Sequence, residues 1–280
     1  MNQRLLDILS CPNCHANMTV SEDKKVCRCT GEKTHCFDFA KSGYINLLNP
    51  GKKNNAKAGD SAEMIRARSL FFETGCYSPI CDTLSTIVSG FEPSVVVDAG
   101  CGEGYYTSKI ASKCDALVYG FDMSKHGTER ASKRDRVGGV KNSFYAVANI
   151  FNMPLKAECA DVIVNAFAPV ADEEFYRVLK KGGYLIICAS GEHHLESLKR
   201  KLYTQVYLNE PSEHSYKGFE LIERKTLRYD TTVSGYEAIW ALFQMTPYYH
   251  RTSLEDKAKL DGLESLTTEV EVDFFILKKI

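Results

Sequence analysis

Three glycines at every second position follow directly on a short apolar run. They are Gly100, Gly102 and Gly104, and the run is 95–97, closed by Asp98. A β-branched run of this length is typical of a buried parallel strand, and glycines after it let the backbone turn tightly and approach a ligand closely. A helix is predicted to begin near Tyr105. Strand, glycine-rich loop and helix in this order predict a cradle for a nucleotide-like cofactor.

The glycine spacing and two acidic residues indicate which cofactor binds. The dinucleotide fingerprint places its third glycine after two intervening residues, so that a pyrophosphate packs on the helix N-terminus. Here Glu103 stands between the last two glycines, where a carboxylate would repel a pyrophosphate and suit a sulfonium or ammonium group. Asp122 ends the next apolar run, where such folds bind ribose hydroxyls. The pattern resembles motif I of class I S-adenosylmethionine-dependent methyltransferases; the alternative is a glycine turn without a ligand.

Further candidates for cofactor contacts follow other predicted strands. Asn149 and Ile150 come after the third strand, where these folds usually hold an adenine. Asn165 ends the fourth strand at the edge where catalysis is expected. Phe167, two residues later, either stacks on a base or plugs the core, and the sequence leaves both open.

Tyr77 and His194 are candidates on loops. Tyr77 lies between two predicted helices, where it either closes on the methionine end of the cofactor or packs as a core tyrosine. The adjacent pair His193 and His194 could indicate a metal site. However, neighbouring residues point in different directions, and no acid or thiol recurs at ligand spacing. We therefore expect a hydrogen-bonding role for His194 near the cofactor.

Five of the eleven cysteines crowd into the first 36 residues. Cys11 and Cys14 have the spacing at which two thiolates reach one zinc ion. Further ligands are available from Cys27, Cys29, His35 and Cys36. A redox role is disfavoured because no strand precedes the pair and no βαβ unit follows at once. The pattern predicts a closed structural zinc site that holds the fold; the alternative is free thiols.

Bulk properties indicate a cytoplasmic protein with a basic N-terminal part. The chain has 280 residues, a net charge of −1, no apolar run long enough to span a membrane and no apolar core where a signal peptide would need one. Its other six cysteines are scattered, as in a chain with reduced thiols.

Between Lys41 and Lys57 there are four lysines and no acidic residue. Such a stretch fits contact with phosphate, or a solvated loop.

The predicted elements divide the chain into three parts. Residues 1–48 form the zinc domain, ending in a strand over 37–48, and 49–60 form a basic linker. In 61–280 two helices (61–76 and 78–90) precede alternating strands and helices, which predicts a parallel sheet covered on both faces. The predicted strands are 95–98, 117–122, 143–148, 161–167 and 184–189, the helices 105–113, 124–134 and 171–179. A turn is predicted at 180–184. Strands at 219–228 and 270–280, with a helix from 236, complete the chain.

Several segments in order closely resemble the RlmA family of large-subunit ribosomal RNA guanine-N1 methyltransferases. They are the Cys-x-x-Cys with its later Cys and His, and the segments 37–48, 59–68, 98–107 and 244–247, the last reading Gln-Met-Thr-Pro. Segments 37–48 and 59–68 are the most specific, since generic methyltransferases lack them. The resemblance implies an α/β fold: a Rossmann-like class I methyltransferase sheet with a small N-terminal zinc-binding domain that helps to hold a 23S rRNA hairpin, and often a homodimer.

The resemblance also assigns residues. Cys11, Cys14 and His35 match zinc ligands, and Tyr77, Tyr106, Thr107 and His194 match cofactor contacts. For the third sulfur ligand both Cys27 and Cys29 are available, and Cys29 is favoured because its shorter loop needs less distortion. The expected cofactor contacts are therefore Tyr77, Asp98, Gly100, Gly102, Tyr106, Thr107, Asp122, Asn149, Ile150, Asn165 and His194, and the expected zinc ligands are Cys11, Cys14, Cys29 and His35.

The chemistry implied is methyl transfer to guanine N1. This atom carries a proton, so the enzyme must remove that proton, expose the base and hold it in line with the sulfonium methyl. Asp60, Glu63 and Asp172 are candidate bases, and the sequence does not choose among them. Two alternatives remain: a small-molecule methyltransferase, which has no use for a zinc module, and a non-catalytic RNA-binding protein, which would be expected to lose the cofactor residues.

Overall fold

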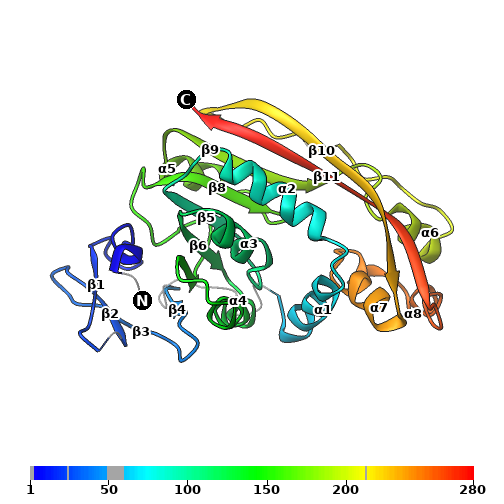
Figure 1. Ribbon diagram of the computed structural model, residues 1–280, viewed down its shortest axis with the longest axis horizontal. Coiled ribbons are helices and arrows are strands. Elements are labelled where there is room, and N and C mark those ends of the chain that lie inside the picture. The colour runs from blue at the N-terminus through cyan, green and yellow to red at the C-terminus, as the bar shows by residue number, and fades with distance from the viewer. Residues whose placement is uncertain (1–2, 24, 49–59, 212) are drawn as a thin grey trace.

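The computed structural model describes residues 3–23, 25–48, 60–211 and 213–280. Within them an eight-stranded sheet forms the centre and a small three-stranded sheet lies at the N-terminal end (Figure 1). The large sheet has the order β10-β11-β9-β8-β5-β6-β7-β4. Its strands are β4 (Ile45–Asn46), β5 (Val95–Ala99), β6 (Leu117–Asp122), β7 (Ser143–Val147), β8 (Ala160–Ala166), β9 (Leu179–Ser190), β10 (Phe219–Ser234) and β11 (Ser265–Lys279). The helices are α1 (Ala62–Glu73), α2 (Ser78–Ser89), α3 (Tyr105–Lys113), α4 (Lys125–Gly138), α5 (Asp172–Val178), α6 (Glu196–Leu202), α7 (Tyr236–Gln244) and α8 (Leu254–Ala258), with 3-10 turns η1 (Gln3–Leu6) and η2 (Tyr249–Arg251).

The centre of the sheet confirms the predicted alternation of strands and helices. Strands β5, β6, β7, β8 and β9 pair in parallel, and all five residues of β5 are buried. Val96 packs into the core under α2 and α3, whereas Val95 and Val97 pack into a second core with α5 and η1. Because successive strand residues point to opposite faces, the continuous apolar run fills both cores.

The C-terminal strands form the other edge of the sheet. The expected strands at 219–228 and 270–280 correspond to β10 and β11, which are longer and pair antiparallel along their whole length. Figure 1 shows this pair running along the sheet and reaching α7 and α8. The predicted turn at 180–184 is wrong, since β9 already begins at Leu179. Lys180 there forms an ion pair with Asp161, 2.6 Å between Nζ and Oδ1.

The N-terminal part is attached to the large sheet. Its own sheet contains β1 (Met18–Val20), β2 (Val26–Cys29) and β3 (Cys36–Asp38). The single strand predicted over 37–48 is instead divided into β3 and β4 by a turn at 41–43, where Gly43 has a φ of +105°. β4 pairs in parallel with β7, so the end of the range 1–48 adds a strand to the large sheet. The predicted linker 49–60 lies outside the described residues except for Asp60.

Helix α1 begins where the sequence indicates. The Ser61 hydroxyl accepts a hydrogen bond from the Met64 N–H at 3.2 Å and so caps the helix. Helix α2 follows after Gly75, with Pro79 in its first turn. Among the helices of the described residues, none is long and apolar enough to cross a membrane.

The glycine-rich loop gives a first prediction. Gly100 has a φ of +93°, and a Cβ added there would lie 2.5 Å from Cβ of Ala168. We expect Gly100→Ala to lower the free energy of unfolding by about 1–3 kcal/mol, from backbone strain and overpacking. Gly138→Ala is the matched control, because a Cβ at this helical position meets nothing within 4 Å. It should raise stability by up to about 1 kcal/mol. Urea unfolding measures both, and equal stability of the two variants would contradict the expectation.

Candidate active site

One large cavity of about 840 Å³ opens at the carboxyl ends of the parallel strands. This volume suits a cofactor together with part of a substrate. The glycine loop after β5, the ends of β6, β8 and β9, helix α1 and the segment 245–250 contribute its walls. Of the expected cofactor contacts, those that line it are Tyr77, Gly100, Gly102, Tyr106, Asp122, Asn149, Ile150 and His194.

Asp122 is fixed at the end of β6 by backbone donors. The N–H of Gly102 donates to its Oδ2 at 2.9 Å, and the N–H of Ser124 donates to its Oδ1 at 2.7 Å. Burial raises the pKa of this carboxyl, although both hydrogen bonds act against the rise. Each carboxylate oxygen keeps accepting capacity toward the cavity. The arrangement fits the ribose hydroxyls of a nucleoside cofactor.

Glu103 does not play the part that the sequence indicates. Its side chain is 1% exposed, and its carboxylate accepts from Arg134 of α4 and Ser69 of α1, with Arg130 Nε at 3.5 Å. Burial raises the pKa of Glu103 to about 7, despite the arginines nearby. Because Arg134 and Ser69 donate to its two oxygens, the carboxylate joins α1 and α4 to the glycine loop, although it also lines the cavity.

Tyr77 and His194 form a buried hydrogen-bonded pair in which the donor and the acceptor can be assigned. The backbone N–H of Glu271 donates to His194 Nδ1 at 3.2 Å, so that nitrogen carries no proton. Burial lowers the pKa of His194 to about 4, which keeps the ring neutral with its proton on Nε2. Nε2 therefore donates to the Tyr77 hydroxyl oxygen, 2.9 Å away. The Tyr77 hydroxyl proton is left for a ligand.

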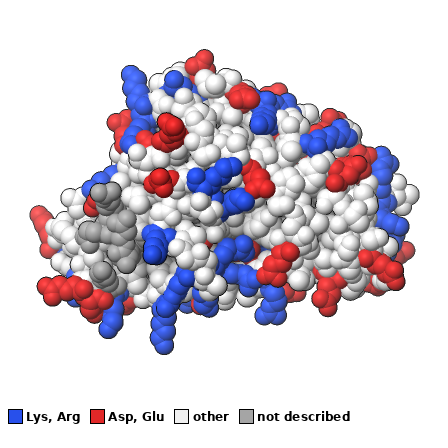
Figure 2. All heavy atoms as spheres, in the orientation of Figure 1, with Lys and Arg blue, Asp and Glu red and all other residues white. Residues whose placement is uncertain are grey.

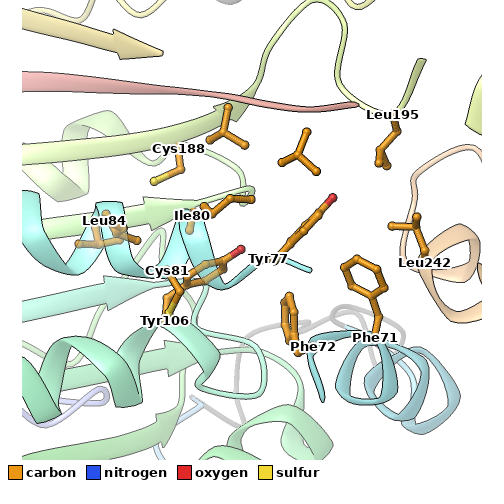
Figure 3. Packing of buried hydrophobic residues seen from close by; sticks show 14 of the residues in the cluster. Phe71, Phe72, Tyr77, Ile80, Cys81, Leu84, Tyr106, Cys188, Leu195 and Leu242 are labelled. Atoms are coloured by element: carbon orange, nitrogen blue, oxygen red, sulfur yellow. The ribbon is translucent and has the colours of Figure 1, made fainter. Parts of the chain in front are cut away.

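Packing fixes the position of the Tyr77 ring. The ring makes an edge contact with Phe71 of α1, with centroids 4.8 Å apart. Figure 3 shows Tyr77 beside Phe71 and Phe72, with its hydroxyl group pointing away from them. Tyr77 thus lies in the core and also lines the cavity, which combines the two interpretations that the sequence left open.

Three expected cofactor contacts lie behind the cavity wall. Asp98 is 1% exposed and accepts from the Thr107 hydroxyl at 2.5 Å, which ties β5 to α3. Burial raises the pKa of Asp98 to about 7. Asn165 Nδ2 donates to the carbonyl oxygens of Ala99 and Pro169, at 3.0 and 3.1 Å. These side chains hold the loops that face the cavity.

The candidate bases differ in position. Asp60 lines the cavity and forms an ion pair with Arg68, whereas Glu63 and Asp172 are not among the lining residues. The carboxylates among the described lining residues are Asp60, Glu103 and Asp122.

Part of the cavity wall was not predicted from the sequence. Lys199 and Asn209 line the cavity; Lys199 Nζ donates to Asn209 Oδ1 at 2.6 Å, and Asn209 Nδ2 donates to the Gly191 carbonyl at 2.7 Å. Arg68, His214 and His250 also line it. Asn209 and His214 lie in an irregular segment without periodicity, so no sequence signal indicated them. Arg68 falls in the specific segment 59–68, which was a usable signal.

The N-terminal module contains a compact group of metal-ligating side chains. Cys11, Cys14, Cys29 and His35 offer ligand atoms that all lie within 4.8 Å of one another. Sγ of Cys29 is 3.4 Å from Nδ1 of His35. Burial opposes ionisation of Cys29, but hydrogen bonds from the backbone of His35 and Gly31 lower the pKa of its thiol to about 6. Three thiols and one imidazole form a donor set that fits structural zinc.

Cys27 is not part of this group. Its side chain is fully buried among apolar residues, and burial raises the pKa of its thiol to about 11. Its sulfur is not among the four ligand atoms that lie within 4.8 Å of one another. The structure thus brings together the four ligands that the sequence favoured.

The fold and the cavity define an S-adenosylmethionine-dependent methyltransferase. The residues present fit this cofactor: Asp122 ends β6, where such folds bind ribose hydroxyls, Gly100 leaves no room for a side chain, and the buried Tyr106 hydroxyl has no hydrogen-bond partner among the described residues. Residues 92–232 match the family described as a methyltransferase domain, and 9–57 match the RlmA N-terminal zinc ribbon. The chain belongs to the RlmA family of 23S rRNA (guanine-N1)-methyltransferases.

Two relatives support the family assignment, and one solved structure supports the fold. The Bacillus subtilis protein YxjB, named provisionally as a 23S rRNA (guanine-N(1)-)-methyltransferase, is 31% identical over 95% of each chain. The 23S rRNA (guanine(748)-N(1))-methyltransferase of Streptomyces fradiae is 30% identical over 71% of this chain and 69% of its own. A structure concerned with thioacetal formation in echinomycin biosynthesis is 14% identical, with a TM-score of 0.51 over 72% of this chain and 82% of that one, and supports the fold alone.

The metal group gives a second prediction. Cys29→Ser should reduce the zinc that copurifies with the protein, because it removes one of four ligands, whereas Cys27→Ser should retain the zinc of the wild type. Elemental analysis of the purified variants measures this. Loss of zinc from Cys27→Ser, with retention in Cys29→Ser, would assign the ligand to the other cysteine.

The buried His194 gives a third prediction. An unfolded histidine binds a proton near pH 6.5, but folded His194 does so only near 4, so protonation favours unfolding as the pH falls between these values. The wild type should lose roughly 1.4 kcal/mol of stability per pH unit in this window relative to His194→Gln. Urea unfolding at pH 7 and pH 5 measures the difference. Parallel pH profiles of the two proteins would contradict a neutral buried His194.

Proposed function

We propose that this protein transfers a methyl group from S-adenosylmethionine to N1 of a guanine in a hairpin of 23S rRNA. The single observation that carries the proposal is one continuous cavity that joins the glycine loop and Asp122 to the loop after β8 and the segment 245–250. The similarity to the Streptomyces fradiae enzyme over most of both chains supports the substrate.

The residues proposed to contact the cofactor are divided between the two ends of its site. Asp122 holds the ribose, Ile150 and Asn149 hold the adenine, and the Tyr77 hydroxyl donates to the carboxylate of the methionine end. When bound, the cofactor supplies the electrophilic methyl group. Asp98, Thr107 and Asn165 act from behind by fixing the loops.

The protein's own contribution to the chemistry is orientation and exclusion of water. Helix α1 covers the cavity with Met64, Arg68 and Phe72, and apolar walls strengthen electrostatic interactions inside. Guanine N1 must lose its proton in the reaction. Of the three predicted bases, the position of Asp60 supports such a role best, although its ion pair with Arg68 opposes it; the positions of Glu63 and Asp172 give no support.

The surface beside the zinc module supports contact with RNA. Helix α4 carries five Lys or Arg and two Asp or Glu. Figure 2 shows basic side chains gathered over the region where Figure 1 places α3 and α4. Arg136 of α4 donates to the Lys41 carbonyl of the N-terminal module at 3.0 Å, so this surface and the module adjoin. Basic side chains on one face provide the phosphate contacts that RNA binding needs. The basic stretch 49–60 is assigned to the same role from its sequence.

We further propose that the enzyme acts in the cytoplasm, where ribosomal RNA is modified, and as a homodimer. The exposed edge strand β10, with Leu221 and Ile222 about half exposed, offers one surface for self-association. Sedimentation of the purified protein at several concentrations measures the oligomeric state, and a monomer at all of them would refute the dimer.

The fourth prediction tests the reaction itself. Incubation of unmodified 23S rRNA with the protein and S-adenosylmethionine should produce a primer-extension stop at one hairpin guanine, because N1 methylation blocks base pairing. Asp122→Ala should abolish the stop at low cofactor concentration. Absence of a stop with the wild type, under conditions where it binds the cofactor, would refute the rRNA reaction and favour a small-molecule acceptor.

A further inference from the structure

Phe167 stands out among the residues that line the cavity. It follows β8 directly, and the residue is 42% exposed and lines the cavity, so it does not plug the core as one sequence-based interpretation held. Its backbone has a φ of +54°, a left-handed conformation that bulky side chains rarely adopt. An exposed apolar ring on a strained backbone gains little stability for the fold. Such positions persist where function needs them.

Three contacts hold this unfavourable backbone in place. The Phe167 N–H donates to the Cys188 carbonyl of β9 at 3.0 Å. Asn165 Nδ2 donates to the Pro169 carbonyl in this loop and to the Ala99 carbonyl at the end of β5, and this Asn165 clamp ties the loop to the neighbouring strand. Ala168 fills the hollow left by Gly100, where a Cβ would lie 2.5 Å away. The loop is thus fixed from three directions, and the ring is presented to the cavity.

The position of the ring separates it from the expected adenine site. Asp122 ends β6 and Ile150 follows β7, whereas Phe167 follows β8, and β5 lies between β8 and β6. Neighbouring strands are about 4.8 Å apart, so the end of β8 is about 10 Å from the end of β6. Phe167 therefore lies on the other side of the glycine loop, with the rings of Tyr106 and His194 at centroid distances of 6.3 and 6.4 Å.

We propose that Phe167 is the platform on which the target guanine stacks, held toward the cavity by the Asn165 clamp. This inference rests on the proposed rRNA reaction and names the residue that receives the extruded base. A flat aromatic face accepts any base, so the ring supplies affinity and orientation and leaves sequence selection to other contacts. Stacking places the plane of the base parallel to the ring and restricts the direction from which N1 meets the methyl group.

Three variants of Phe167 test the proposal. Phe167→Leu removes the ring and should lower kcat/KM for unmodified 23S rRNA by about 5- to 150-fold, with the dissociation constant for S-adenosylmethionine unchanged. Phe167→Trp keeps a stacking face and should retain most of the activity. Phe167→Gly relieves the left-handed strain, so it should lose activity as Phe167→Leu does while its Tm stays equal to or above that of the wild type.

Phe91→Leu is the matched control. Phe91 is half-buried at the opposite edge of the sheet, where its ring stacks on Tyr184 with centroids 4.0 Å apart. The Phe91→Leu variant also loses one aromatic ring but should retain wild-type kcat/KM. Wild-type kcat/KM in Phe167→Leu, or a loss explained wholly by weaker cofactor binding, would overturn the proposal.

A binding measurement provides a readout that does not depend on methyl transfer. The chain has one Trp, at position 240, so Phe167→Trp adds one fluorophore in the cavity. Saturating unmodified 23S rRNA should quench the added emission through stacking with the guanine, and unchanged emission would overturn the proposal. If the wild type binds the RNA with no primer-extension stop, the proposed reaction fails while this quenching still reports on the ring.

Discussion

The active end of the molecule depends on the close approach of two loops, after β5 and after β8. They meet where Gly100 leaves a hollow that Ala168 fills, and one added methyl group would bring two carbon atoms to 2.5 Å. Because the strands are parallel neighbours, both loops emerge at the same edge of the sheet. Their contact fixes the direction in which the next residues point. Removal of this contact would displace Phe167 on one side and the turn at Gly102 on the other.

Buried charge concentrates around the same loops. Glu103 joins α1 and α4, Asp98 holds α3, and Asp122 holds the turn at Gly102. Each carboxylate is expensive to bury, and each finds donors that compensate only part of that desolvation, as their raised pKa values indicate. Such groups add little net stability compared with apolar packing. Their effect is to fix the arrangement of the elements that surround the cavity.

Much of the fold could be predicted from the sequence because local patterns determine it. The apolar runs and glycines located β5 to β8, and the bounds predicted for α3 and β6 agree with the structure. The spacing of the cysteines predicted the group of zinc ligands. The role of Glu103 could not be predicted, since its partners on α4 lie about thirty residues away and its neighbours gave no sign of them. Asn209 and His214 were missed because tertiary contacts alone bring their irregular segment to the cavity wall.

The attachment of the N-terminal module through β4 fixes the distance between the zinc-ligand group and the cavity. β4 pairs with β7 on the sheet, and Leu9 forms a further bridge to Leu155, so the module is held to the catalytic body at more than one point. A module joined only by a flexible chain would let the active end sample many nucleotides around an anchored hairpin. With two attachment points, the module stands at a set distance from the cavity. Under the proposed function, a hairpin stem bound at the module would present to the cavity the nucleotide that lies at this distance, and an RNA with one base pair more or less would present a different base.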